Sequence, residues 1–307
     1  MSLKIILIHP PVSKCPEPPA GLGKLSACLK TNNVQHDIID ANMEGILFLL
    51  EYASRLNTND RWSIRACKKM EENLAALRNI TTYRNLSRYQ RAVTDINHLL
   101  NIAGKQCNVD LSLADYQDKN LSPVNSSDLI ATSENPQANP FYSYFENRLT
   151  NALERDPAFI GFSLNYLSQA LCTFAMIGFI KKIQPGQKII LGGSLVTSWI
   201  KLGAHRNIFH GLVDEMVAGA GEQTLLELLN IENGKTDCPP DYNGFPLDQY
   251  LSPGLILPYS SARGCYWHKC SFCPEKAEGN AYLPLEVSQV ATELQALTQP
   301  ETHSYSR

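Results

Sequence analysis

The feature that most constrains the fold of this chain is an alternation of short apolar segments with segments of helical periodicity. Lys4 to His9 is rich in isoleucine, which is typical of a buried strand. Apolar residues between positions 22 and 29 are spaced for one face of a helix, and Val34 to Ile39 then predicts a second strand that ends at Asp40. A strand, a helix and a strand in succession predict a βαβ unit and a parallel sheet.

The same alternation returns in the second half of the chain. Strands are predicted at Phe159 to Leu164, Lys188 to Leu191 and Leu212 to Ala218. Helices are predicted at 167–182, 196–202 and 223–229, between and after these strands. Together with the first two strands, this pattern predicts an α/β domain over residues 1–230 with a flavodoxin-like, doubly wound parallel sheet.

Residues 46–140 interrupt the alternation and predict an insertion. Its first part predicts helices at Ile46 to Leu56, Asp60 to Ile80 and Ser87 to Lys105, with many basic residues. These basic residues indicate either a solvated helical surface or an insertion that covers one end of the sheet. Residues 106–140 are polar, with proline and asparagine steps, and predict a loop.

A change of composition marks the end of the first domain. Residues 231–254 contain paired prolines and Asn-Gly steps, which predict a linker. Leu255 to Ser260 then predicts a strand that leads into a cysteine-rich loop, and apolar residues from Val287 to Leu297 are spaced for a helix. Residues 255–307 are therefore expected to begin a second domain.

Composition limits the kinds of partner. The net charge of −3 gives no reason to expect nucleic acid or an anionic membrane as a partner. The apolar run at the N-terminus is too short for a signal peptide or a membrane span, so a cytoplasmic protein is expected. Six scattered cysteines are predicted to be small buried residues: Cys15, Cys28, Cys67, Cys107, Cys172 and Cys238.

Three further cysteines are clustered. Cys265, Cys270 and Cys273 fall within nine residues, so their thiolates can wrap one metal centre. A mononuclear zinc site needs a fourth ligand, for which His268 is the candidate. A [4Fe–4S] cluster needs one ligand per iron, so three cysteines leave one iron open to bind a small molecule.

The cysteine loop resembles that of radical S-adenosylmethionine (radical SAM) enzymes. The resemblance is carried by Arg263-Gly264-Cys265 after a predicted strand and by Phe272 directly before the last cysteine, although the first gap is one residue longer than usual. It implies that the three cysteines hold three irons, that Phe272 shields the cofactor, and that the fourth iron binds S-adenosylmethionine. One electron from a donor such as flavodoxin or ferredoxin would then release a 5′-deoxyadenosyl radical that attacks a small-molecule or peptide substrate.

The N-terminal half contains Pro10-Pro11, Pro19, Gly21-Leu22-Gly23 and Leu25, followed by a predicted strand that ends at Asp40. This pattern resembles the cobalamin-binding domain that precedes the radical domain in many members of this family. The resemblance implies cofactor contacts through nine residues, which are Gly21, Asp40, Asn42, Ser163, Gly192, Gly193, Gly219, Gly221 and Glu222. Glycines here let a nucleotide-like tail lie against the strand ends. In the Asp-x-His-x-x-Gly motif that ligates cobalt from below, this chain has Asn42 in place of histidine, so no protein ligand to cobalt is expected.

The resemblance implies a cobalamin-dependent radical SAM enzyme that methylates or rearranges an unactivated carbon. Only about fifty residues follow the linker, whereas a partial barrel needs on the order of 200. The sequence therefore predicts only the first βα unit of that barrel and a truncated radical domain. Two alternatives are a non-catalytic cobalamin-type binding domain with a vestigial cluster loop and a zinc-stabilised interaction module.

Overall fold

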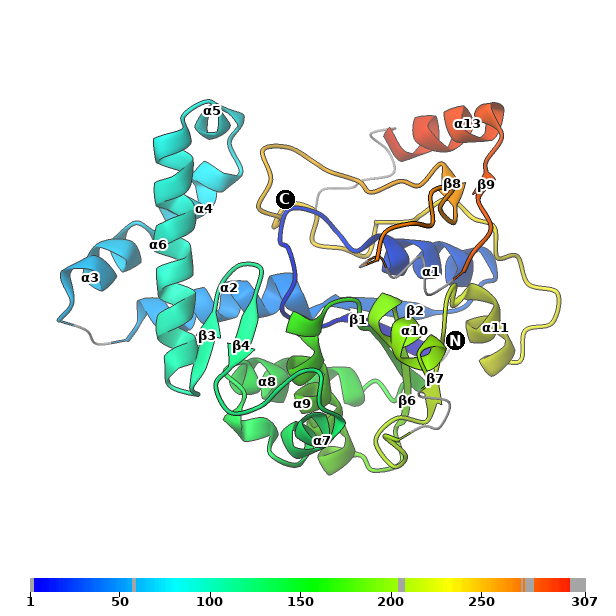
Figure 1. Cartoon of the computed structure of the whole chain (residues 1–307), viewed down its shortest axis with the longest axis horizontal. Coiled ribbons are helices and arrows are strands. Elements are labelled where there is room, and N and C mark those ends of the chain that lie inside the picture. The colour runs from blue at the N-terminus through cyan, green and yellow to red at the C-terminus, as the bar shows by residue number, and fades with distance from the viewer. Residues whose placement is uncertain (1–2, 57–58, 204–207, 272, 274–278, 299–307) are drawn as a thin grey trace.

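A five-stranded parallel sheet forms the centre of the molecule in the computed structural model, which describes residues 3–56, 59–203, 208–271, 273 and 279–298 (Figure 1). The strand order is β2-β1-β5-β6-β7, and every pairing is parallel. This order, which reverses direction between β1 and β5, is that of a doubly wound α/β sheet, so the predicted fold class is confirmed at that level. The strands are β1 (Ile5–His9), β2 (His36–Asp40), β5 (Phe159–Ser163), β6 (Lys188–Gly192) and β7 (Glu215–Met216).

β7 is shorter than the predicted strand. The backbone N–H groups of Leu212 and Val213 both donate to the carbonyl of Phe209, which holds them in a turn rather than in the sheet. Beyond the two strand residues, the N–H of Val217 still donates to the carbonyl of Leu191. The chain therefore runs along this edge of the sheet only briefly before it leaves for the next helix.

Helices cover both faces of the sheet. In Figure 1, α1 (Ala20–Thr31) lies above the sheet, where it contacts α11 (Glu222–Leu228). Below the sheet, α9 (Leu167–Ile183) is flanked by α7 (Ser126–Glu134) and α8 (Tyr142–Leu153). Every residue of α9 from 169 to 180 is buried, which explains why its sequence is almost continuously apolar rather than striped. α10 (Ser194–Lys201) follows β6.

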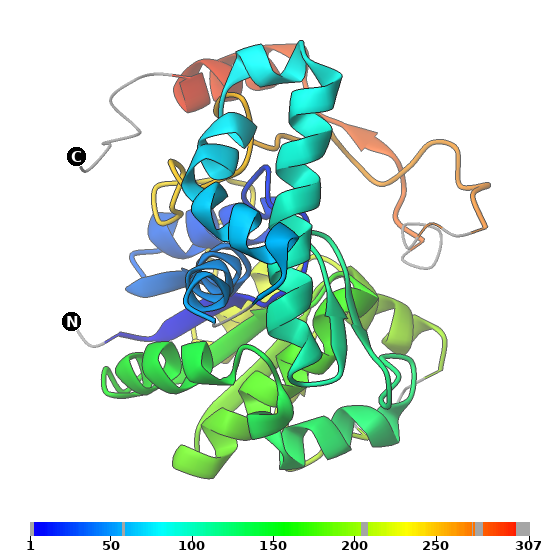
Figure 2. The same ribbon diagram turned by 90° about the vertical axis from the view of Figure 1, so that its left-hand side faces the viewer.

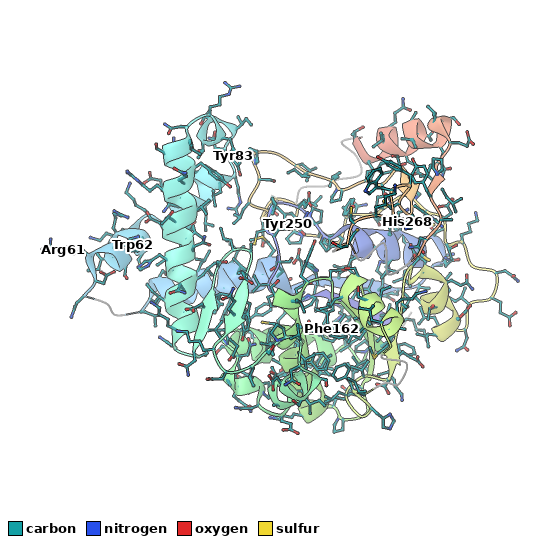
Figure 3. The ribbon with its side chains drawn as sticks, viewed as in Figure 1. Arg61, Trp62, Tyr83, Phe162, Tyr250 and His268 are labelled. Carbon is teal, nitrogen blue, oxygen red and sulfur yellow. The ribbon has the colours of Figure 1, made fainter. Side chains whose placement is uncertain are left out.

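The predicted helical insertion is present and projects from one end of the sheet (Figure 2). It contains α3 (Arg61–Lys68), α4 (Met70–Leu77), α5 (Ile80–Tyr83) and the long α6 (Leu86–Lys105), with Arg61 and Trp62 far from the sheet (Figure 3). The single helix predicted over 60–80 is wrong. The axis breaks at Lys69, which lets α3 and α4 each bury apolar residues against α6.

Two boundaries in this part of the chain also differ from expectation. α2 (Ala41–Ser54) begins five residues before the predicted start, because the Asp40 side chain accepts a hydrogen bond from the N–H of Met43 and caps the helix. The loop predicted at 106–140 is wrong as well. It contains the hairpin β3 (Val109–Leu111) and β4 (Tyr116–Asp118), then α7 and a 3-10 turn at Pro136–Ala138.

The physical reason lies in how few residues each element needs. β3 and β4 are only three residues long, so alternation is hard to detect, although Val109, Leu111 and Tyr116 are all buried. Asn125, which resembled a loop residue, caps α7 by accepting from the N–H of Ser127. Asparagine favours both turns and helix starts, so composition alone could not distinguish them.

The predicted linker contains no helix or strand, yet it is packed onto the α/β domain. We call residues 235–258 the strap. Tyr242, Phe245 and Tyr250 are buried there, and the N–H of Asp241 donates to the carbonyl of Gly23 in α1. Arg78, directly after α4, donates to the carbonyls of residues 249 and 250. These contacts fix the strap against α1 and the helical insertion.

The strand predicted at Leu255 to Ser260 is wrong. Pro258 has no N–H to donate, and Leu255 and Ile256 remain 41% and 39% exposed without a sheet edge to join. Instead, β8 (Ala262–Arg263) pairs with β9 (Leu283–Pro284) in a short antiparallel hairpin. The predicted C-terminal helix is confirmed as α13 (Val287–Thr298).

Candidate functional site: a pocket on the sheet and a cysteine segment

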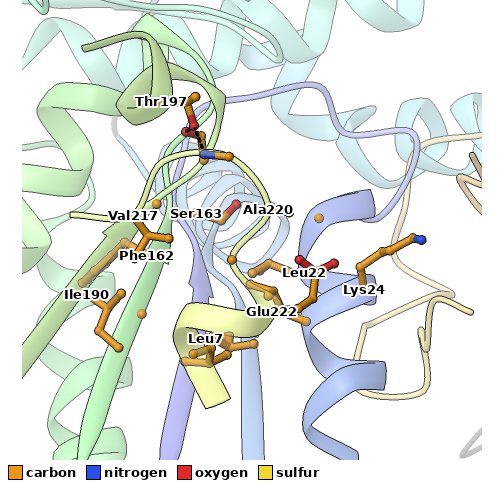
Figure 4. A pocket seen from close by; sticks show the side chains of 18 of the residues that line it. Leu7, Leu22, Lys24, Phe162, Ser163, Ile190, Thr197, Val217, Ala220 and Glu222 are labelled. Carbon is orange, nitrogen blue, oxygen red and sulfur yellow. Dashed lines mark hydrogen bonds between the residues drawn. The ribbon is translucent and has the colours of Figure 1, made fainter. Parts of the chain in front are cut away.

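An apolar pocket of about 350 Å³ opens on the sheet face beneath α1 and α11 (Figure 4). Its floor is formed by strand residues on one face of the sheet: Ile5, Leu7, Gly161 and Ile190. Its walls come from Val217 and from leucines of the two helices at positions 22, 25, 225 and 228. A concave, mostly apolar site with a few polar groups is the usual form of a small-molecule site.

Seven of the predicted cofactor residues line this one pocket: Gly21, Ser163, Gly192, Gly193, Gly219, Gly221 and Glu222. They are spread over about two hundred positions of the sequence, and the doubly wound topology brings them together because parallel strands end at the same edge. Gly193 is required for geometry. Its φ is +109°, and a Cβ there would lie 2.3 Å from the carbonyl oxygen of Leu164.

The polar side chains beside the strand ends form a tight network. Asn165 donates to the carbonyl and to the hydroxyl oxygen of Ser163, at 3.2 and 3.0 Å, and accepts from the N–H of Ser194. The Thr197 hydroxyl donates to the carbonyl of Gly193 and accepts from the N–H of Gly219, at 2.8 Å (Figure 4). These bonds tie the turns after β5, β6 and β7 to one another and hold the rim of the pocket in place.

Sequence reasoning missed Asn165, Thr197 and all the apolar lining residues. Asn165 lies two positions after the end of β5, where polar residues often serve a site, so its position was a usable indication. Thr197 lies inside α10, and nothing in its local sequence shows that it reaches the turn at Gly219. The lining residues Ile190 and Val217 resemble any other buried strand residues.

Asp40 and Asn42 lie outside this pocket, and both are 1% exposed. The Asn42 side-chain oxygen accepts from the N–H of Ser13 at 2.9 Å, and Asp40 accepts from the Tyr250 hydroxyl at 2.5 Å. Burial, together with the adjacent Asp40 carboxylate, raises the pKa of Tyr250 far above its usual range. Asp40 therefore joins the start of α2 to the strap, and Asn42 joins it to the loop at Ser13.

Buried groups nearby are held in their neutral forms. His9 lies at the end of β1 and shares a 2.8 Å hydrogen bond with the Ser13 hydroxyl, and burial lowers the pKa of its imidazole. Burial raises the pKa of the Cys15 and Cys172 thiols to about 12, so neither is a reactive thiolate at neutral pH. The scattered cysteines at 15, 28, 172 and 238 are buried as predicted, and Cys67 and Cys107 are partly buried.

In Figure 1, β8, β9 and α13 of the cysteine segment, residues 262–298, lie above α1. The described residues of this segment are mostly exposed or partly buried. Cys265, Cys270 and Cys273 are each partly buried, and the N–H of Cys273 is 3.5 Å from the carbonyl of Cys270. Within the described part of the chain, no group of three or more His, Cys, Asp or Glu side chains is arranged to hold a metal ion. Phe272 lies outside the described residues.

His268, the alternative zinc ligand, makes a different contact. Its Nε2 atom is 2.9 Å from the carbonyl oxygen of Asn280, across the loop that joins β8 to β9. Gly264 forms the tight turn before Cys265, with a φ of +68°, and a Cβ there would lie 2.2 Å from the carbonyl oxygen of Ala281. A residue with a side chain would be strained at this turn, so the geometry requires glycine.

Comparison with known proteins identifies no relative. No family model, no curated protein and no solved structure matches the chain. Among the described residues, no helix has the length and apolar character to cross a membrane. Fold and site define the class only as a doubly wound α/β protein with an apolar pocket at the carboxyl ends of its strands.

Proposed function

We propose that this chain is a cobalamin-binding radical SAM protein that methylates or rearranges an unactivated carbon. The observation that carries the proposal is the convergence of seven predicted cofactor residues on one apolar pocket. Each of these residues is a weak indication alone, and their meeting at the carboxyl ends of β5 and β6 is what a nucleotide-like ligand needs.

The pocket fits the base of the cobalamin tail better than it fits the corrin ring. A volume of about 350 Å³ between apolar walls suits a planar aromatic base. Ser163 accepts a hydrogen bond from Asn165, and its own O–H has no acceptor in the part of the chain that the structure describes. That O–H is available to donate to a ring nitrogen of the base.

A base held in the pocket cannot also coordinate cobalt. The side-chain oxygen of Asn42 is engaged with the N–H of Ser13, so this chain offers no protein ligand from that position either. Cobalamin supplies a transferable methyl group or a reducible cobalt when bound. The role of the protein residues would be to hold the tail and to keep water from its base.

The three clustered cysteines fit a [4Fe–4S] cluster by donor chemistry, because thiolates are the usual ligands of iron–sulfur centres. The cluster supplies the electron that cleaves S-adenosylmethionine. Trp267 and Tyr266 on the same loop are 53% and 79% exposed, and aromatic side chains of this kind can shield a cluster from water. Flavodoxin or ferredoxin is the proposed electron donor.

The first experiment measures binding of hydroxocobalamin, with absorbance reporting whether the base leaves the metal. Gly221 has ordinary backbone angles, and a Cβ there would lie 3.6 Å from Leu25, so Gly221→Phe adds a ring inside the pocket with little strain. We expect wild-type protein to bind one equivalent in the base-off form and Gly221→Phe to lose binding at least tenfold. Gly186→Phe, in open space away from the pocket, is the matched control.

The second experiment is anaerobic reconstitution with iron and sulfide. We expect roughly four irons per chain, lost in Cys270→Ala and kept in Cys107→Ala, a partly buried cysteine outside the segment. One zinc per chain would support the interaction module instead. Cobalamin binding with no iron would support the non-catalytic binding domain, and formation of 5′-deoxyadenosine with a reductant would support the enzyme.

A further inference from the structure

The hydrogen-bond donors that line the pocket predict which corrinoid base it binds. We infer that the pocket selects a corrinoid whose base has a single ring-nitrogen acceptor, such as 5,6-dimethylbenzimidazole, and discriminates against purine bases. This inference rests on the proposed function and specifies the ligand class of the same site.

The uncharged polar side chains that line the pocket have almost no hydrogen-bonding capacity left for a ligand. Both N–H groups of the Asn165 amide are donated to Ser163, and its oxygen accepts from Ser194. The hydroxyls of Ser194 and Thr197 donate to main-chain carbonyls, at 3.2 and 2.9 Å. Among these side chains, only the Ser163 hydroxyl keeps a proton that it can donate to a base.

Apart from two charged side chains, the rest of the lining is apolar. The floor and walls consist of aliphatic side chains from β1, β6, α1 and α11, together with Val217. Benzimidazole joined to its ribose through one ring nitrogen has one acceptor left, which matches the one side-chain donor. Adenine has several ring-nitrogen acceptors and an amine. In this pocket, most of these groups would lose water without gaining a partner, which weakens binding.

Two charged side chains also line the pocket, and one of them could alter this balance. Lys24 points its amine away from the cavity, whereas Glu222 lies beside Leu22 (Figure 4). A carboxylate could accept from the adenine amine. It would also face the ring-nitrogen acceptors, which it cannot satisfy because a carboxylate only accepts hydrogen bonds.

The test compares the dissociation constants of cobalamin and of the same corrinoid with an adenine base, measured by quenching of protein fluorescence. We expect the adenine form to bind at least tenfold more weakly, as an unpaired buried polar group predicts. Val217→Thr adds a hydroxyl to the pocket wall at nearly constant volume. We expect this variant to bring the dissociation constants of the two corrinoids closer together. Val213→Thr, a buried valine outside the lining, is the control and is expected to leave the ratio unchanged.

Each outcome has a separate meaning. Equal binding of the two corrinoids, lost from both in Gly221→Phe, would overturn the selectivity and leave the proposed function standing. Tighter binding of the adenine form, lost in Glu222→Gln, would also overturn the selectivity. It would show that the Glu222 carboxylate recognises the base. Failure of both corrinoids to bind the wild-type chain would overturn the proposed function itself. The free nucleoside of dimethylbenzimidazole is a further probe, expected to displace cobalamin at concentrations where adenosine does not.

Discussion

The pocket and the cysteine segment contrast in how their geometry is held. The pocket is surrounded by buried side chains, and its rim turns are cross-linked by hydrogen bonds through Asn165 and Thr197. The cysteine segment has a two-residue hairpin, and Leu297 is the one buried residue of α13. Among the described residues of the segment, six large apolar side chains are exposed.

This difference indicates what makes each of the two sites ordered. Apolar burial alone is sufficient to shape a cavity before any ligand arrives. Three thiolates on a short loop have no comparable support, and in small metal sites the free energy of metal binding supplies the folding energy. We therefore expect the pocket to be formed without its ligand and the cysteine segment to become ordered when its metal centre binds.

The largest expected effect comes from the strap. Tyr242 is 1% exposed, lies against Gly23 of α1 and donates its hydroxyl to the carbonyl of Pro258 at 2.5 Å. Tyr242→Ala is expected to lower the free energy of unfolding by about 3–5 kcal/mol, as large aromatic deletions in cores do. Tyr266→Ala, where the side chain is 79% exposed in the cysteine segment, is expected to change it by less than about 0.5 kcal/mol. Urea denaturation measures both, and equal effects would contradict the contrast.

A smaller difference is expected between two glycines with positive φ. Gly193→Ala puts a Cβ against the carbonyl of Leu164, where the chain leaves β5 and β6, and should destabilise the protein by about 1–3 kcal/mol. Gly264→Ala meets the carbonyl of Ala281 in the β8–β9 hairpin, which can open locally. Gly193→Ala should therefore lower the melting temperature, whereas Gly264→Ala should leave it unchanged. Gly264→Ala should instead reduce the iron content after reconstitution. A lowered melting temperature for Gly264→Ala would show that the segment is part of the cooperative unit.

Acid should weaken the α/β domain through His9. Burial lowers the pKa of this imidazole in the folded state, so the unfolded chain binds a proton more readily below about pH 6.5. Its contribution to stability is therefore lost as the pH falls below that value, by at most about 1.4 kcal/mol per pH unit. His9→Gln should lower stability at pH 7 and show a shallower loss between pH 6.5 and 5. An unchanged slope would show that His9 titrates normally in the folded protein.

The smallest effect tests whether the cysteine segment depends on its metal. Addition of a zinc chelator to aerobically purified protein should leave the melting temperature of the α/β domain within about one degree, because surface changes away from the core have little effect on stability. A fall of several degrees would mean that a zinc centre supports the whole fold.

The sequence predicted the sheet, its crossover helices and most of the pocket glycines, because strand ends, glycine turns and helical periodicity leave local traces. It could not predict the strap, because Tyr242 and Tyr250 resemble loop residues until their contacts with Gly23 and Asp40 are known. Asn42 was predicted to be a poor cobalt ligand. Its side chain is instead buried against the loop at Ser13. This contact depends on tertiary structure, so the local sequence gives no sign of it.

Hydrogen exchange measured by mass spectrometry tests the two-region account most directly. Cobalamin should protect peptides that line the pocket, around positions 160–165, 190–197 and 217–225, from an already slow baseline. Anaerobic cluster reconstitution should protect residues 262–298 from a fast baseline. Fast exchange throughout the pocket before ligand is added, or slow exchange in the metal-free cysteine segment, would contradict the account.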